Sequence, residues 1–166
     1  MASSDIRLAT TADVVALLDC WVELVESQRP YGTQLLADEN REIAEQWTVE
    51  LVVQQQIVVA EINNTIIGFV SFEPKKDRFK RAISAGIIHN LYVRERYRDQ
   101  GIGSRLLVRA EEELSQLGVD QIRLEILQEN EAAEAFYRNR SYQPHRIAFT
   151  KAATETDTHN TLDKES

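Results

Sequence analysis

The run IVVAEINNTIIGFVSFEP at positions 57–74 limits the possible folds most strongly, because it joins two strand-like segments by a very short turn. Both segments are rich in β-branched and aromatic residues, which favour extended backbone. Asn63 and Asn64 lie between them, and asparagine accepts the positive φ angles that a tight hairpin turn needs. The sequence therefore predicts a β-hairpin, and with it an antiparallel sheet in the middle of the chain.

The other predicted elements surround this hairpin in a regular order. A short strand begins near Ile6, and a helix follows it with Thr10 or Thr11 as its N-cap. Gly86 indicates a bulge, or a close approach of another segment, within a later strand. Further helices are predicted at 37–55, 103–117 and after Asn130, and further strands at 83–93, 120–127 and 145–151. This order is typical of a mixed α/β fold with an antiparallel first half and a strand-helix-strand second half.

The length and the two ends of the chain indicate one domain. The chain has 166 residues, about the size of a single domain, which we expect to cover residues 5–151. Residues 152–166 are polar, and we expect them to be disordered. The chain begins without the pattern of a signal peptide, and no apolar run is long enough to cross a bilayer. These features predict a cytoplasmic protein.

The charge and the cysteine content exclude several classes of function. A net charge of −8 argues against nucleic acid or an anionic membrane as the main partner, and it fits a cationic or amine-bearing partner better. The single cysteine, Cys20, falls within an apolar helical pattern and is interpreted as a core residue rather than a nucleophile. Cysteine and histidine residues do not show zinc spacing, so no metal is expected.

The segment RDQGIGSR at 98–105 combines bare backbone with positive charge. Gly101 and Gly103 allow backbone N–H groups to approach a ligand where a helix begins and its positive dipole end is exposed. Between His89 and Arg109 the chain has five arginines against two carboxylates. The segment is therefore interpreted as a binding site for a diphosphate.

The spacing of the glycine pair argues against two other interpretations. A P-loop needs a lysine followed by serine or threonine, which the segment lacks. A dinucleotide-binding fold needs a third glycine where this chain has Leu106. A plain strand-to-helix turn that uses glycine for tightness stays open as the alternative.

Two motifs resemble those of the acetyl-CoA-dependent N-acetyltransferase superfamily called GNAT. The first is RDQGIG preceded by LYV, and the second is NEAAEAFYRNRSY after a helix and a strand. The residues that match the family pattern are Arg98, Gly101, Gly103, Asn130, Ala133, Phe136 and Tyr137. The resemblance implies the GNAT fold, a central, mixed but mostly antiparallel sheet flanked by helices, with acetyl-CoA as cosubstrate.

The resemblance also implies which residues bind the cofactor. In the family, the pantetheine arm pairs like an extra strand with the segment that is Leu91, Tyr92 and Val93 here. The residues that correspond to the family's diphosphate loop are Arg98, Asp99, Gln100, Gly101, Ile102, Gly103 and Ser104. Asn130 and Tyr137 are also expected at the cofactor.

The family's chemistry implies a proton donor and a proton acceptor. Tyr137 resembles the donor to the leaving thiolate, with a core aromatic as its alternative reading. For the acceptor, Glu125 lies where ribosomal-protein N-terminal acetyltransferases carry a proposed base, and His89 lies four residues before Val93, where several members place a catalytic glutamate. A solvated strand residue for Glu125, a structural histidine for His89, and a water chain as the acceptor all stay open.

The expected reaction is the transfer of acetyl to a primary amine of a small molecule or of a peptide or protein. Direct attack in a ternary complex is expected, because the sequence offers no credible nucleophile for an acyl-enzyme. The alternative is a CoA-binding module without catalysis, since the strand before the loop lacks the glutamate. Ser141 stands where the family commonly has glycine, which implies a different or strained helix end. The oligomeric state is left open between monomer and homodimer.

Overall fold

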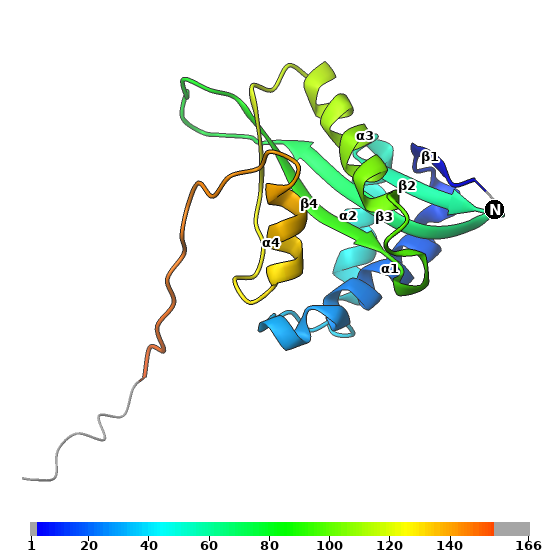
Figure 1. The fold of residues 1–166 in the computed structure, drawn as a ribbon, viewed down its shortest axis with the longest axis horizontal. Helices are drawn as coiled ribbons and strands as arrows, with labels where there is room; N and C mark the ends of the chain where they lie inside the picture. The colour runs from blue at the N-terminus through cyan, green and yellow to red at the C-terminus, as the bar shows by residue number, and fades with distance from the viewer. Residues whose placement is uncertain (1–2, 155–166) are drawn as a thin grey trace, which may run out of the picture. The chain divides into compact units, whose positions relative to one another are not determined.

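The computed structural model describes residues 3–154, and it contains a five-stranded sheet in the order β1-β2-β3-β4-β5. The strands are β1 (Asp5–Leu8), β2 (Ile57–Ile62), β3 (Thr65–Pro74), β4 (Ala85–Val93) and β5 (Gln121–Leu124). The first four strands pair antiparallel with their neighbours, and β5 pairs parallel with β4. This is the predicted mixed, mostly antiparallel sheet (Figure 1).

The chain divides into two compact units. The first unit ends at Glu131 and contains the whole sheet. Its helices are α1 (Val14–Ser27), α2 (Arg41–Val53) and α3 (Ile102–Gln116), with short 3-10 turns η1 (Thr11–Asp13), η2 (Arg29–Tyr31) and η3 (Glu95–Tyr97). The second unit begins at Ala132, so nearly all of α4 (Glu131–Arg138) belongs to it.

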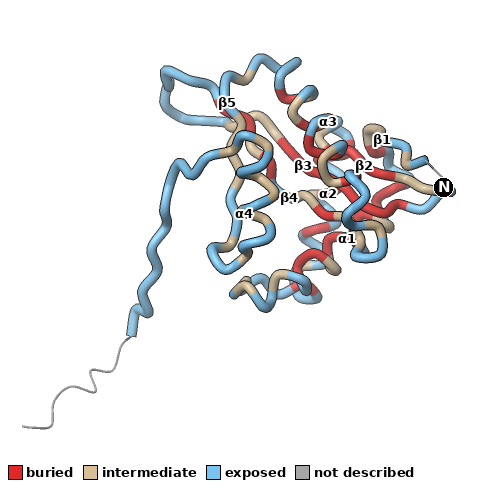
Figure 2. Tube along the Cα trace, viewed as in Figure 1, coloured by how far each residue is buried: buried red, intermediate tan, exposed pale blue. Residues whose placement is uncertain are grey.

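Helices cover both faces of the sheet in the first unit. The apolar sides of α1 and α2 join a buried cluster with Val59, Phe69 and Tyr92 of the strands. On the opposite face, α3 buries Leu106, Leu107, Ala110 and Leu114. The buried segments therefore follow the middle strands and the inner sides of the helices (Figure 2).

The predicted hairpin is confirmed. Ile62 pairs with Thr65, and the two residues between them, Asn63 and Asn64, have φ angles of 48° and 62°. Gly86 is confirmed as a point of close approach: a Cβ built there would lie 2.7 Å from a methyl carbon of Leu114 on α3. No register shift occurs at Gly86 itself, so of its two predicted readings the close approach is the correct one.

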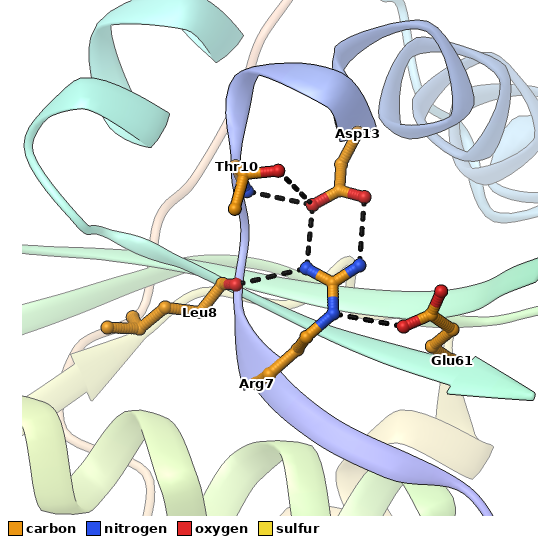
Figure 3. A network of polar contacts seen from close by, with 5 residues as sticks. All are labelled: Arg7, Leu8, Thr10, Asp13 and Glu61. Atoms are coloured by element: carbon orange, nitrogen blue, oxygen red, sulfur yellow. Dashed lines mark hydrogen bonds and ion pairs between the residues drawn. The ribbon is translucent and has the colours of Figure 1, made fainter. Parts of the chain in front are cut away.

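An ion-pair network joins the first strand to the helix that follows it (Figure 3). The guanidinium of Arg7 donates to both carboxylate oxygens of Asp13, at 2.8 and 3.0 Å, and its Nε lies 3.0 Å from Glu61. The backbone N–H of Thr10 also donates to Asp13 at 2.8 Å. Of the two predicted N-caps, Thr10 and Thr11, Thr10 caps the 3-10 turn η1, and Asp13 is the N-cap of α1 itself. The network fixes the turn between β1 and α1, and the hydrogen bond from Arg7 lowers the pKa of Asp13 below its ordinary value.

Some predicted elements have different limits in the structure. The helix predicted at 37–55 begins at Arg41, and the strand predicted at 120–127 ends at Leu124, where its pairing with β4 ends. The strand predicted at 145–151 is wrong, because these residues form no ladder. Ile147 and Phe149, the two large apolar residues of this segment, are 79% and 92% exposed.

The predicted limits of the domain stay a prediction. Of the tail that was expected to be disordered, residues 155–166 lie outside the described part of the chain. Within residues 3–154, no helix has the length and apolar character needed to span a bilayer.

Candidate functional site

Strands β4 and β5 pair over less than half the length of β4. The pairs run from Ala85 with Gln121 to Ile88 with Leu124, whereas β4 continues to Val93. Residues 90–93 pair with β3 on one side. On the other side, no strand of residues 3–154 covers residues 89–93. An uncovered strand edge presents backbone N–H and C=O groups, which an extended ligand uses as it would a neighbouring strand.

A β-bulge lies at the start of this uncovered edge. Ser71 of β3 pairs with Asn90, but the next residue, Phe72, pairs with Ile88, so His89 has no residue opposite it. A bulge leaves the extra residue outside the ladder and re-aims its side chain, and bulges are common beside active sites for this reason. The structure thus places His89 where β4 and β5 separate.

The side chain of His89 is held by two other elements. Its Nε2 lies 2.9 Å from Oε1 of Glu73 on β3. Its ring meets the edge of Trp47 on α2, with ring centroids 5.6 Å apart and an interplanar angle of 78°. The imidazole side chain remains 32% exposed. The ring is therefore oriented by protein groups and still accessible.

The second candidate base, Glu125, lies just beyond the end of β5. It follows Leu124, the last residue paired with β4, and its side chain is exposed. Because Leu124 pairs with Ile88, Glu125 and His89 each come one residue after that last pair. The predicted strand position of Glu125 is thus wrong by one residue, and the two candidates flank the point of separation from opposite strands.

The loop between β4 and α3 has the conformation expected of a glycine turn. Asp99 and Gly101 have φ angles of 61° and 79°, and α3 begins at Ile102, one residue before the predicted start. A Cβ at Gly101 would meet nothing within 4 Å, so the backbone angle, not crowding, explains the glycine. The first N–H groups of a helix have no intrahelical acceptor and carry its positive dipole end, which suits an anion.

Arg98 connects this loop to the end of β4. Its Nε donates to the carbonyl of Val93 at 2.8 Å, and its guanidinium carbon lies 5.4 Å from the centre of the Tyr92 ring. The side chain is otherwise exposed. Because a guanidinium has five N–H donors in a fixed fork, the outer donors remain for a ligand while Nε fixes the side chain.

Tyr92 points away from the uncovered edge and into the protein. It is 8% exposed and belongs to the apolar cluster under α1 and α2. Its hydroxyl donates to Glu23 of α1 at 3.2 Å, and burial raises the pKa of Tyr92. Tyr92 is thus available to a ligand through its backbone, as are the flanking, half-buried Leu91 and Val93.

The remaining predicted residues lie at and within the last described helix. The N–H of Asn130 donates to the carbonyl of Leu127 at 2.9 Å, directly before α4 begins at the predicted position. Tyr137 belongs to the second unit, where its ring packs edge-on against Phe136 and Tyr142. Burial raises the pKa of Tyr137 to about 12, so the phenol keeps its proton throughout the neutral range.

The backbone conformation of Ser141 distinguishes between the two predicted helix ends, a different cap or a strained one. It has a φ angle of 68°, so it adopts the left-handed conformation itself, where glycine would be free of strain. The N–H of Tyr142 donates to the carbonyl of Tyr137 at 3.1 Å and closes the turn. The strained helix end is therefore the correct reading.

Glu73 and Trp47 were not among the residues predicted at the site. Both lie within elements that were predicted, but their proximity to His89 depends on the register of β3 with β4 and on the packing of α2. Metal ligation finds no support in the part of the chain that the structure describes, where no three His, Cys, Asp or Glu side chains are grouped to hold an ion.

Comparisons with known proteins agree with this architecture. A family model described as the acetyltransferase (GNAT) family matches residues 21–142, which is more than half of the chain. No curated protein matches the chain at a significant level.

Several solved structures have a similar fold. Aminoglycoside N-acetyltransferase AAC(6′)-Iy in complex with CoA is 12% identical with a TM-score of 0.71, and 93% of this chain and 97% of that chain are covered. A ribosomal-protein-alanine N-acetyltransferase from Brucella melitensis biovar Abortus 2308 is 16% identical with a TM-score of 0.64, covering 90% and 99%. The PaiA N-acetyltransferase from Thermoplasma acidophilum in complex with coenzyme A is 20% identical with a TM-score of 0.67, covering 82% and 88%. At these identities the similarity shows the fold.

Proposed function

The chain belongs to the acetyltransferase (GNAT) family, and on this premise we propose that it transfers acetyl from acetyl-CoA to a primary amine. The acceptor is an amine of a small molecule or of a peptide or protein. The observation that carries the proposal is the early end of the β4–β5 ladder: the edge at 89–93 opens toward a left-handed glycine turn and a helix N-terminus.

The residues of this region fit the shape and charge of the cosubstrate. The backbone at Leu91, Tyr92 and Val93 offers a strand edge to the pantetheine arm. The N-terminus of α3 and the loop 98–104 offer N–H groups, and Arg98 offers a cation, to the diphosphate. Acetyl-CoA, when bound, supplies a thioester whose acetyl group goes to the amine while the thiol of CoA leaves.

This chain must supply two proton-handling groups for such a transfer. An alkylamine with a pKa near 10 is almost wholly protonated at neutral pH, so a base must take its proton before attack. Of the two candidates, His89 is supported by its bulge, its fixed ring and its accessibility. Tyr137, whose pKa is raised to about 12, acts as a protonated hydrogen-bond donor to the leaving sulfur.

The names of the structural neighbours represent both acceptor classes. One is an aminoglycoside N-acetyltransferase and another a ribosomal-protein-alanine N-acetyltransferase. The net charge of −8 favours a cationic acceptor of either class. Direct attack, rather than an acyl-enzyme, is the proposed route, because the one cysteine is fully buried in α1.

A thiol-release assay tests the proposal. The protein is incubated with acetyl-CoA and a panel of aminoglycosides, polyamines and N-terminal peptides, and free thiol is followed over time. We expect release that depends on both protein and acceptor, with intersecting rather than parallel lines when both concentrations are varied. Tight CoA binding without acceptor-dependent release would instead favour a CoA-binding module.

A further inference from the structure

We propose that Glu73 is a positioning residue, which orients His89 so that one ring nitrogen is left free to act as the base. This inference rests on the proposed acetyltransferase function. The contact lies between β3 and β4 and brings the carboxylate of Glu73 to the candidate base His89. The two residues are sixteen positions apart in the sequence.

The strand geometry places both side chains on one face of the sheet. Side chains alternate along β3, so Glu73 shares a face with Ser71 and Phe69, and Phe69 packs in the cluster under α1 and α2. On β4 the bulge at His89 interrupts the alternation, and this brings the imidazole to the same face as Trp47 and Glu73. Without the bulge, His89 and Glu73 would not share this face.

The chemistry of the contact fixes the tautomer of the imidazole. An ionised carboxylate only accepts hydrogen bonds, so the ring nitrogen Nε2, 2.9 Å from Glu73, must carry the hydrogen. In a neutral imidazole one nitrogen is a donor and the other an acceptor. The contact therefore leaves Nδ1 as the basic nitrogen, and the carboxylate holds the ring in that tautomer and orientation.

A second polar pair lies beside the first on the same face. Asn90, the residue after His89, donates from Nδ2 to Oγ of Ser71 at 3.3 Å, and Ser71 is fully buried. Polar groups in a sheet interior are costly unless they are bonded. Farther along this face, Phe69 and Tyr92 make apolar contacts. The two polar pairs lie instead beside the point where β4 and β5 separate, and the proposed reaction requires polar groups there.

Stability alone is a weak explanation for the Glu73–His89 contact. The two side chains are 38% and 32% exposed, and ion pairs at such exposure contribute little to folding. If position 89 served only to pack against Trp47, a leucine would do this as well, and no carboxylate would be needed at position 73. The arrangement is better explained by the orientation that it gives to an accessible imidazole.

The test compares Glu73→Ala and Glu73→Gln with the parent protein. Nitrogen NMR of the free protein, with histidine labelled in the ring, reports which nitrogen of His89 carries hydrogen. A solvated histidine ring already favours Nε2–H, so we expect nearly exclusive Nε2–H in the parent, a measurable rise of the Nδ1–H fraction toward the solvated mixture in Glu73→Ala, and a smaller rise in Glu73→Gln, whose amide oxygen still accepts. The control is Glu113→Ala, which removes an ion pair of the same 2.9 Å length to Arg109 on α3.

Kinetics provide the second readout. Glu73→Ala should lower kcat by about tenfold or more with the KM for acetyl-CoA unchanged, Glu73→Gln should recover part of it, and Glu113→Ala should match the parent. Unchanged ring-nitrogen signals in Glu73→Ala, or changed signals with unchanged kcat, would overturn the positioning role. If the parent itself transfers no acetyl group, the proposed function fails, and the orientation by Glu73 still stands or falls on the nitrogen signals.

Discussion

Ile88 and Leu124 form the last pair between β4 and β5, and the two strands separate immediately beyond them. Every candidate group of the first unit lies at or beyond this pair. His89 and Glu125 follow it on the two strands, the uncovered edge of β4 runs from it, and the glycine turn lies after the far end of that edge. The functional proposal therefore depends on this one separation.

Coenzyme A should protect the amides along the uncovered edge from hydrogen exchange. A ligand that pairs with β4 gives backbone N–H groups at 89–93 an acceptor that β5 does not provide. We expect slower exchange there on adding CoA, measured by mass spectrometry of short peptides. Strand β2 (Ile57–Ile62), which pairs on both sides, serves as the internal control. Equal exchange with and without CoA at 89–93 would contradict the proposed binding mode.

Replacing Gly101 with alanine should weaken CoA binding more than it weakens folding. The φ angle of 79° costs an alanine about 1 kcal/mol, although its methyl group has open space. Gly118, at the end of α3, has the same φ angle and the same open space. Gly118→Ala should thus show the same loss in urea unfolding, whereas only Gly101→Ala should raise the Kd for CoA, by about tenfold in calorimetry. Equal Kd values for the two variants would argue against the loop as the diphosphate site.

Tyr137→Phe should lower kcat and leave the affinity for acetyl-CoA nearly unchanged. The phenol, with its pKa raised to about 12, stays protonated and donates a hydrogen bond, and phenylalanine keeps the ring but loses the donor. Because a raised pKa keeps the group neutral up to about that pH, Tyr137 should not cause a loss of rate between pH 7 and 9. Tyr142→Phe, a ring that packs against Tyr137, is the control. A parental kcat in Tyr137→Phe would remove the donor role.

The sequence could predict the features that depend on neighbours in the chain. The hairpin turn at Asn63 and Asn64 follows from the positive φ angles that asparagine accepts, and both residues adopt them. Such preferences act within a few residues. They do not depend on which strands pair with one another.

The features that sequence analysis missed depend on contacts between distant segments. The bulge at His89 is a property of the register between β3 and β4, and neither strand indicates it alone. Glu73 lies near the end of a predicted strand, and only that register places it beside the imidazole. The strand predicted at 145–151 failed for the same reason, since alternating Ile147 and Phe149 form a strand only when a partner edge pairs with them.

Asp13→Asn should destabilise the fold at neutral pH and much less in acid. The hydrogen bonds from Arg7 lower the pKa of Asp13 in the folded protein, so the charged carboxylate stabilises the fold above the unfolded pKa near 4. That contribution is lost as the pH falls from about 4 through the lower folded pKa. Because Asp13 is buried, the free energy of unfolding at pH 7 should fall by about 2 to 4 kcal/mol in urea unfolding, and the difference from the parent should be smaller at pH 3.

The control is Asp19→Asn, whose ion pair with Arg41 is half exposed and should contribute under about 1 kcal/mol. If the difference in unfolding free energy between Asp13→Asn and the parent did not change with pH, the substitution would be acting through an interaction other than the charge-dependent bond to Arg7.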